Sequence, residues 1–218
     1  IPRDLWLVDL KAKINTAYAL GEERKKHGGL LLTKAVVEKI FNQPVDYVLR
    51  IDFNGFVKAI DMVGGVDANV EKGFEDLEYP IAGKETDDCG FTGEEFEKRA
   101  TQSAVFEVFP CRYEHLVFQE GLVHMDGETA LKFVRSRHAK GTEGTDFARS
   151  KRQEIVIEAF KNKALSLNTL LNPGKIMNLY NIFQDSLHTN IQQNEYDDFI
   201  KLAMKVKDAQ INNVVFFY

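Results

Sequence analysis

A cluster of basic side chains between residues 135 and 152 is the part of the sequence best suited to chemistry. It holds six Lys or Arg against two acids, whereas the whole chain has 28 basic and 33 acidic residues and a net charge of -5. Arg149 and Gln153 are four residues apart and would share one face of a helix. Guanidinium groups present several donors in one plane and stay charged at physiological pH, which suits phosphate. The cluster therefore predicts a site for a phosphate-like anion, and the alternative from charge alone is a solvated basic helix.

A second basic group lies near the amino end, where a strand is expected to end. In open α/β sheets ligands gather at strand ends, so we expect both groups to converge on one anion. The converging cations would be Arg3, Lys13, Arg135, Arg137 and Arg149, with Asp4 orienting an arginine or lying near a metal. A pyrophosphate or phosphodiester fits such a site, because guanidinium groups help most as the leaving phosphate becomes more negative.

The hydrophobic pattern predicts the elements that position these residues. Apolar runs predict strands at 4–10, 45–51, 66–70, 122–125 and 214–218. Apolar spacings of three and four predict helices at 13–20, 30–41, 53–62, 94–104, 147–164, 173–185 and 195–209, and one that begins after Asp126-Gly127. Asp52 and Asp146 would cap two of these helices, and Gly64-Gly65 would end one. Residues 72–120 form an excursion from the core, and one α/β domain over residues 1–218 is the simplest account.

The composition indicates a folded protein and leaves its compartment open. Hydrophobic residues make up 44% and include 16 Phe, which is enough for a substantial core. Cys89 and Cys111 could close a loop or remain two unpaired thiols. The first residues resemble neither a signal peptide nor a start of translation. We therefore expect an excised fragment, with any export signal or membrane anchor preceding Ile1.

Five segments in series resemble the successive motifs of the LytR-CpsA-Psr family. Their order and spacing match from Ile1 to the helix expected at 147–164. The segments are Ile1-Pro2-Arg3-Asp4, Lys13-Ile14-Asn15-Thr16-Ala17-Tyr18-Ala19, Asp61-Met62-Val63-Gly64-Gly65-Val66, Gly127 to Arg137, and Asp146 to Gln153. Each motif alone is weak, and the series makes the resemblance specific.

The resemblance implies a fold, an activity and a location. The fold would be a three-layer α-β-α sandwich with a central mixed sheet, with a hydrophobic tunnel for polyprenyl pyrophosphate lipids. The activity would be phosphotransfer that moves a glycopolymer, such as teichoic acid or capsular polysaccharide, from its polyprenyl pyrophosphate carrier to peptidoglycan, with Mg²⁺. The location would be the extracellular face of the bacterial membrane, reached through an amino-terminal transmembrane helix.

Residue by residue, the resemblance implies a pyrophosphate head-group site. Arg3, Arg135, Arg137 and Arg149 would be catalytic and would contact the head group together with Gln153. Lys13 and Arg152 would be further substrate-binding residues, and Asp4 a supporting one. The carboxylates that hold the metal are expected from a segment before Ile1.

Other classes of function compete with this interpretation. A non-catalytic module of the cell envelope would bind polyprenyl phosphate without turning it over. Nucleic-acid binding through the basic residues is disfavoured by the net charge of -5, and a P-loop enzyme by the lack of its sequence motif. His138 follows Arg137, and we expect a surface or structural role for it.

Overall fold

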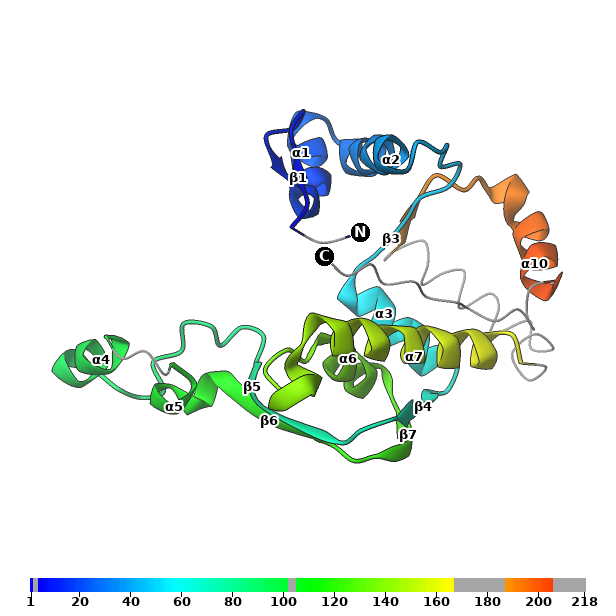
Figure 1. Cartoon of the computed structure of the whole chain (residues 1–218). Coiled ribbons are helices and arrows are strands. Elements are labelled where there is room, and N and C mark those ends of the chain that lie inside the picture. The colour runs from blue at the N-terminus through cyan, green and yellow to red at the C-terminus, as the bar shows by residue number, and fades with distance from the viewer. Residues whose placement is uncertain (2–3, 102–104, 167–186, 206–218) are drawn as a thin grey trace. The chain divides into compact units, whose positions relative to one another are not determined.

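Figure 1 shows the computed structural model of the chain, which describes residues 1, 4–101, 105–166 and 187–205. Contacts divide the chain into two compact units, Ile1–Gly55 with Met177–Asp208 and Phe56–Ile176 with Ala209–Tyr218. Each unit is described by itself. The helix expected at 173–185 and the strand expected at 214–218 lie outside the described residues. The single domain expected from the sequence stays a prediction.

The first unit is built from short strands and a pair of helices. Its elements are β1 (Trp6–Leu7), β2 (Ala12–Lys13), a 3₁₀ turn (Ile14–Thr16), α1 (Ala17–Arg24), α2 (Gly28–Phe41), β3 (Leu49–Ile51), β8 (Leu187–Thr189), a 3₁₀ turn (Gln193–Glu195) and α10 (Tyr196–Lys205). β1 pairs antiparallel with β2, and β3 with β8. The strand expected over 4–10 is wrong in length, because Lys11 N donates to Val8 O at 3.2 Å and the chain reverses there.

The hairpin of α1 and α2 depends on glycine at its closest approach. A Cβ on Gly28 would lie 2.3 Å from Gly21 O, and one on Gly21 would lie 2.5 Å from Gly28 O. No larger side chain fits between these two backbones without a shift. The helices expected at 13–20 and 30–41 are thus confirmed as helices, with their starts displaced along the chain.

The second β-pair of the first unit is fastened by polar contacts over a long sequence separation. Val48 N donates to Asn190 Oδ1 at 2.8 Å, and Tyr47 Oη donates to Glu195 Oε1 at 2.7 Å. The Tyr47 ring also meets the Phe199 ring edge-on, with centroids 4.8 Å apart. The helix expected at 195–209 is confirmed over Tyr196–Lys205, and its last residues lie outside the described ones.

Helix α3 (Phe53–Met62) runs across the boundary between the units. Asp52 Oδ1 accepts a hydrogen bond from Gly55 N at 2.7 Å, which confirms the predicted N-cap. Gly64 and Gly65 follow the helix at φ 85° and 78°, a left-handed conformation that favours glycine. The end predicted for this helix is therefore confirmed.

The second unit contains an antiparallel ribbon and the helices that pack on it. Its elements are β4 (Val66–Val70), β5 (Phe74–Pro80), α4 (Gly93–Ala100), α5 (Val105–Val108), a 3₁₀ turn (Pro110–Arg112), β6 (Tyr113–Phe118), β7 (Gly121–Met125), α6 (Gly127–Arg135), a 3₁₀ turn (Gly141–Gly144) and α7 (Asp146–Ala164). β4 pairs with β7 and β5 with β6, so the four strands follow one another as a two-stranded ribbon (Figure 1). Residues 72–120 are therefore not an excursion throughout, since β5 and β6 belong to this ribbon.

The core of the second unit lies between the ribbon and helices α3, α6 and α7. Side chains alternate between buried and exposed along β4 and β5, as expected for strands with one buried face. Phe133 of α6 packs its ring against Phe118 and Phe74, with centroids 5.0 and 5.9 Å apart. Val156 of α7 is 1% exposed in the same cluster.

The far end of the ribbon is an arm closed by a disulfide. Cys89 and Cys111 are bonded with their Cα atoms 5.6 Å apart, so the bridge left open by the sequence is formed. Phe96 of α4 packs on Phe109 with ring centroids 5.5 Å apart. The helix expected at 94–104 is confirmed over Gly93–Ala100, and residues 102–104 lie outside the described ones.

The described strands and helices together confirm a mixed α/β fold. The strands form four antiparallel pairs among the described residues, and the central mixed sheet of a three-layer sandwich stays a prediction. None of the helices in the described ranges combines the length and apolar character needed to cross a bilayer.

Candidate functional site

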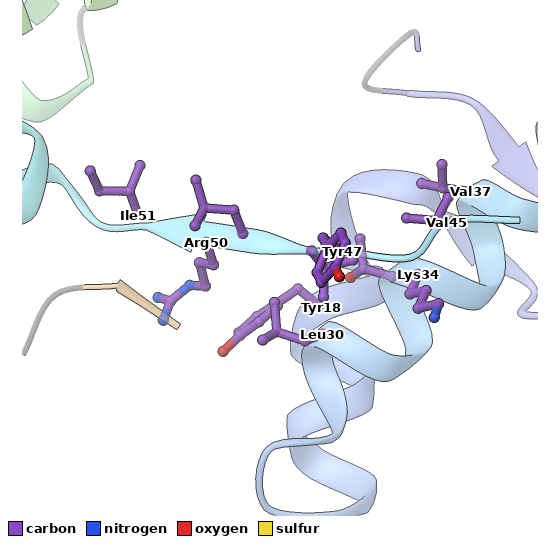
Figure 2. Close-up of a pocket in the computed structure, with 11 residues that line it drawn as sticks. Tyr18, Leu30, Lys34, Val37, Val45, Tyr47, Arg50 and Ile51 are labelled. Atoms are coloured by element: carbon purple, nitrogen blue, oxygen red, sulfur yellow. The ribbon is translucent and has the colours of Figure 1, made fainter. Parts of the chain in front are cut away.

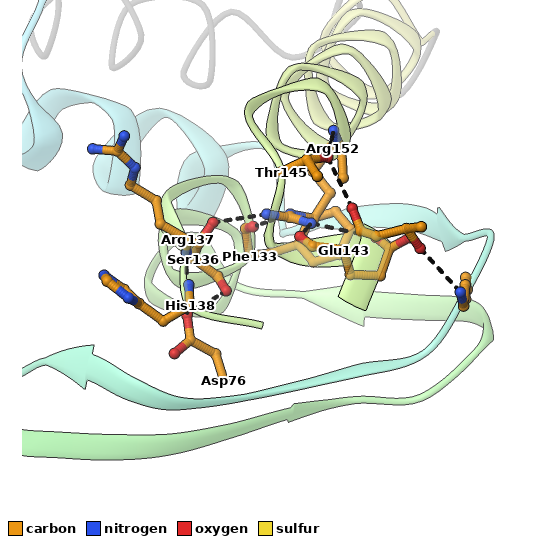
Figure 3. Close-up of polar contacts among 11 residues, drawn as sticks. Asp76, Phe133, Ser136, Arg137, His138, Glu143, Thr145 and Arg152 are labelled. Atoms are coloured by element: carbon orange, nitrogen blue, oxygen red, sulfur yellow. Dashed lines mark hydrogen bonds and ion pairs between the residues drawn. The ribbon is translucent and has the colours of Figure 1, made fainter. Parts of the chain in front are cut away.

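The segment Ser136–His138, which leaves the carboxyl end of α6, is held by one buried carboxylate. Asp76 of β5 is 0% exposed. Its Oδ2 accepts hydrogen bonds from Ser136 Oγ at 2.6 Å and from the backbone N–H groups of Arg137 and His138 at 3.2 Å each. Its Oδ1 accepts a fourth from Glu78 N at 2.9 Å. Figure 3 shows this segment beside the ribbon strand that carries Asp76.

These four donors keep Asp76 ionised. Burial alone raises the pKa of a carboxyl group, because it disfavours the charged form. The hydrogen bonds from Ser136, Glu78, His138 and Arg137 outweigh burial and lower the pKa of Asp76 below its ordinary value. The carboxylate therefore carries a full charge at physiological pH.

Arg152 of α7 holds the same segment from its carbonyl side. Its side chain is 3% exposed, and Nε donates to Phe133 O at 3.0 Å while Nη2 donates to Ser136 O at 2.7 Å. Nη1 donates to Glu143 O at 2.9 Å, and the guanidinium lies 4.7 Å from the centre of the Phe74 ring. Burial lowers the pKa of Arg152 from its ordinary value, and the nearby carboxylates of Glu143 and Asp76 partly oppose that shift.

The predicted role of Arg152 changes accordingly. The sequence assigned it to the substrate, but its guanidinium is buried and donates to oxygens of the protein itself. Arg152 lines a pocket of about 530 Å³, but Nε, Nη1 and Nη2 of its guanidinium each already donate to a backbone oxygen. We therefore give Arg152 a positioning role in place of the predicted substrate contact.

Two of the predicted site arginines meet at a single carboxylate. Asp146, the first residue of α7, places Oδ1 2.8 Å from Arg149 Nη1 and 3.5 Å from Arg137 Nη2. The Asp146 side chain is 75% exposed, whereas that of Arg149 is 19% exposed. The structure therefore brings Arg137 and Arg149 together around an exposed point that already holds one anionic oxygen.

Asp146 is free for this pairing because it is not the N-cap of α7. The sequence predicted Asp146 as the cap, but Thr145 Oγ1 accepts from Ala148 N at 3.2 Å and caps the helix. The cap prediction was wrong by one residue, since threonine and aspartate are both good caps and stand side by side. Because Thr145 is the cap, the Asp146 carboxylate lies in the first turn of α7 and pairs with the arginines.

Arg135 and Gln153 are the other predicted head-group residues of the second unit. Arg135 is the last residue of α6 and is exposed, with its guanidinium 6.0 Å from the centre of the Tyr79 ring. Gln153 is exposed on α7, four residues after Arg149. Both remain predicted head-group residues.

The predicted residues of the first unit form their own small group. Lys13 Nζ lies 3.0 Å from Asp4 Oδ1, and both side chains are exposed. Asp4 thus pairs with Lys13, and its predicted role of orienting an arginine or lying near a metal stays a prediction. Arg3 lies outside the described residues. The convergence of Arg3 and Lys13 with the arginines of the second unit stays a prediction.

His138 lies at the surface, as expected. Its Nδ1 is 3.5 Å from Glu78 Oε2 and its side chain is 55% exposed. It offers its backbone N–H to Asp76 and its ring to solvent.

The described residues do not by themselves form a magnesium site. Their one cluster of three potential ligand residues is Asp87, Cys89 and Cys111, and both cysteines are in the disulfide. Mg²⁺ requires oxygen ligands in octahedral geometry. Asp146 and Asp4 are each paired with cations. The predicted Mg²⁺ stays a prediction.

An apolar cavity of about 700 Å³ lies in the first unit (Figure 2). Its lining consists of Tyr18, Leu30, Thr33, Lys34, Val37, Val45, Tyr47, Val48, Leu49, Arg50 and Ile51. The side chains come from α1, α2 and residues 45–51, and the Arg50 guanidinium lies 4.6 Å from the centre of the Tyr18 ring. Sequence reasoning missed this cavity, because apolar residues of a helix and a strand also fit an ordinary core.

Comparison with known proteins identifies close relatives of the chain. The family model described as LytR_cpsA_psr matches residues 1–217. A Bacillus mycoides protein named polyisoprenyl-teichoic acid–peptidoglycan teichoic acid transferase TagU is 29% identical over 205 residues, covering 92% of this chain and 51% of that protein. The chain thus spans about half the length of the curated relatives that it matches.

Solved structures share its fold. The crystal structure of B. subtilis TagV matches with a TM-score of 0.58 and 26% identity, covering 94% of this chain and 64% of that one. An Enterococcus faecalis protein described as a transcriptional regulator matches with a TM-score of 0.60 and 23% identity, covering 96% of this chain and 60% of that one. The second likeness concerns the fold alone.

Proposed function

Because this chain belongs to the LytR-CpsA-Psr family, we propose that it carries out phosphotransfer that joins a lipid-linked anionic glycopolymer to peptidoglycan. The name of the 29% identical relative, a teichoic acid transferase, supports teichoic acid as the polymer. Capsular polysaccharide is the other polymer implied by the family resemblance. The single observation that carries the proposal is the pairing of Arg137 and Arg149 around one anionic oxygen of Asp146.

The paired arginines are suited to a pyrophosphate head group. Each guanidinium can donate two parallel hydrogen bonds to phosphate oxygens, and the site is exposed enough for a ligand to reach it. Asp146 neutralises the two cations in the absence of ligand, so they can lie close together without mutual repulsion. A pyrophosphate oxygen would take over that role, with Arg135 and Gln153 beside it.

The proposed reaction is an in-line displacement at phosphorus. An acceptor hydroxyl attacks the phosphorus nearer the glycopolymer, the new P–O bond forms, and the bridging P–O bond breaks. The polyprenyl monophosphate departs with the electron pair, and the hydroxyl proton is released to solvent. Arg137 and Arg149 stabilise the charge that grows on the departing phosphate. Asp76 and Arg152 hold the segment that carries Arg137.

The apolar cavity of the first unit is the proposed site for the isoprenoid chain. Leu30, Val37, Val48 and Ile51 provide the apolar surface that a polyprenyl tail requires, and burial stabilises it in proportion to area. Lys34 and Arg50 add cations to the same lining.

The remaining features of the family resemblance belong to the same proposal. They are a three-layer α-β-α sandwich with a central mixed sheet, Mg²⁺ as cofactor, and a location on the extracellular face of the bacterial membrane through an amino-terminal membrane anchor. The disulfide supports an oxidising compartment, since such bonds persist outside the cytosol.

Binding of a short-chain polyprenyl pyrophosphate tests the proposal. Charge-assisted hydrogen bonds contribute roughly 1.5 to 3 kcal/mol, so Arg149→Ala and Arg137→Ala should each lose about tenfold or more in affinity. Lys140→Ala is the matched control, because it removes one exposed cation from the same basic segment. Equal loss in all three variants would show charge attraction without a defined site.

Transfer separates the proposed enzyme from its alternative, the non-catalytic binding module. The assay supplies a lipid-linked glycopolymer, peptidoglycan fragments and Mg²⁺, and measures lipid monophosphate released. Release that depends on Arg149 supports the enzyme. Tight binding without release under these conditions would support the binding module.

A further inference from the structure

We propose that Asp76 is a positioning residue that fixes the segment Ser136–His138, so that Arg137 presents its guanidinium to the anionic ligand. This inference rests on the proposed function for the nature of that ligand. Asp76 is 0% exposed and does not itself reach the surface. It therefore acts on the ligand through Arg137.

The backbone and side chain of Arg137 point in different directions. Its N–H donates inward to Asp76 Oδ2 at 3.2 Å, while its guanidinium lies near Asp146 Oδ1. Figure 3 shows the Arg137 side chain directed away from Asp76. The Asp76 carboxylate thus fixes the backbone from which the Arg137 side chain projects. It makes no contact with the Arg137 guanidinium among the hydrogen bonds and ion pairs of the described residues.

The same segment is fixed from both of its polar sides. Asp76 takes the hydroxyl of Ser136 and the N–H groups that follow it, and Arg152 donates to the carbonyls of Ser136 and Phe133. Asp76 also forms an isolated antiparallel bridge with Ala139. The N–H groups, the carbonyl groups and the following residue of the segment are thus all bonded. The backbone of Arg137 therefore has little freedom to move.

Because these contacts are buried, water cannot replace them if they are lost. Water does not compete for the Asp76 oxygens at 0% exposure, so their loss would leave three N–H groups and a hydroxyl without their partner. Small displacements of a charged group in a binding site have large effects, because alignment with the ligand is lost. Asp76 is therefore expected to affect ligand affinity beyond its effect on folding.

The first test compares Asp76→Asn with Glu75→Gln. Asparagine keeps the size of the side chain but replaces one acceptor oxygen with a donor, so it can satisfy only one of the two sets of donors. Glu75 is the neighbour on β5, and its exposed carboxylate pairs with His115 at 3.4 Å. Affinity for a short-chain polyprenyl pyrophosphate should fall roughly tenfold in Asp76→Asn and stay within twofold in Glu75→Gln.

Affinities are measured well below the melting temperature of each variant, with the folded state verified by circular dichroism. A residue that only stabilises the fold leaves the affinity of folded molecules unchanged. Unchanged affinity in folded Asp76→Asn would therefore overturn the inference while leaving the proposed function intact. Wild-type protein that fails to bind the lipid would contradict the proposed function and this inference with it.

A double-mutant cycle tests whether Asp76 acts through Arg137. Asp76→Asn should cost less than about twofold in an Arg137→Ala background, because the group that it positions is gone. In a Lys140→Ala background the cost should again be roughly tenfold. Equal costs in both backgrounds would overturn the assignment to Arg137.

Ser136→Ala keeps the inference testable if Asp76→Asn does not fold. It removes the hydroxyl donor and leaves the backbone donors to Asp76 in place, so the fold is less affected. Its affinity should fall by roughly threefold, less than in Asp76→Asn, because Arg137 and His138 still donate to Asp76 through their backbone N–H groups. Affinity equal to wild type in Ser136→Ala would contradict the inference in that case.

Discussion

The second unit holds two sets of aspartate and arginine side chains that differ in burial. Asp76 and Arg152 are buried and bonded to backbone groups, whereas Asp146, Arg137 and Arg149 meet at the surface with only side chains in contact. Backbone partners cannot rotate away, and solvent does not screen them. The buried set therefore stabilises structure, and the exposed set can exchange its internal carboxylate for a ligand oxygen. Similar residue types thus perform opposite tasks.

The largest expected effect comes from breaking the buried set at Arg152. Arg152→Ala leaves the carbonyls of Phe133 and Ser136 without their donor and Glu143 without its cation, and should cost about 3 kcal/mol of unfolding free energy. Urea denaturation followed by circular dichroism measures it. Lys151→Ala, a neighbouring exposed cation, should cost less than about 0.5 kcal/mol. Equal costs would mean that the buried contacts of Arg152 add no stability beyond those of an exposed cation.

Asp76→Asn should have the next largest effect, with a characteristic dependence on pH. The loss at pH 7 should be about 2 kcal/mol, since a buried set of donors loses half its acceptors. The pKa of Asp76 is lowered in the folded state, so the unfolded chain takes up the proton more readily. The stabilisation is therefore present above the unfolded pKa of about 3.9 and is lost as pH falls through the lower folded value.

Unfolding free energies from pH 7 down to pH 3 check this prediction. The difference between wild type and Asp76→Asn should be constant above about pH 5 and shrink as the carboxyl group becomes protonated. Glu75→Gln provides the exposed control. A difference that grows toward low pH would contradict the lowered pKa.

The same chemical change in the exposed set should act in the opposite direction on binding. Asp146→Asn removes the carboxylate that competes with a ligand, so affinity for inorganic pyrophosphate should rise by roughly threefold. Its effect on unfolding free energy should stay below about 0.5 kcal/mol, because the pair is exposed. Isothermal titration calorimetry and urea denaturation measure the two quantities. A fall in affinity would show that Asp146 organises the arginines rather than substituting for ligand.

Salt should produce the smallest change in stability. Raising the ionic strength screens the exposed pairs of Asp146 but not the buried contacts of Asp76 and Arg152. The unfolding free energy should therefore change by less than about 0.5 kcal/mol between low and moderate salt. Thermal unfolding in sodium chloride checks this. A large salt effect would mean that the exposed set carries stability.

The sequence predicted the elements better than their pairing. Helix α3, its Asp52 cap and its glycine end follow from local rules, since each depends on residues within a few positions. The pairing of β5 with β6 was missed because Glu75, Asp76 and Glu78 make β5 look like a polar loop. The alternation of inward and outward positions along Phe74–Pro80 was the available sign of a strand. It can be recognised only if the charged residue Asp76 is assigned to the buried face.

The candidate site was predicted in part for a similar reason. Arg137 and Arg149 are recognisable by type and spacing, and the structure brings them together. Arg152 looks the same in the sequence, but burial separates its role from theirs. Burial is set by the packing of α7 on Phe74 and Phe133, which are distant along the chain. No local pattern distinguishes an arginine that faces the core from one that faces solvent.

The position of Asp76 on the inward face of β5 also has a consequence for folding. Asp76 pairs with Leu116 in the ribbon, and its neighbours Glu75 and Leu77 face outward. A slip of one residue would turn Asp76 to solvent and leave Ser136 and the two following N–H groups facing either the apolar Leu77 or the longer side chain of Glu75. Apolar side chains alone would tolerate several alignments. The buried carboxylate therefore favours the observed register of the ribbon strands, because other registers would lose its hydrogen bonds.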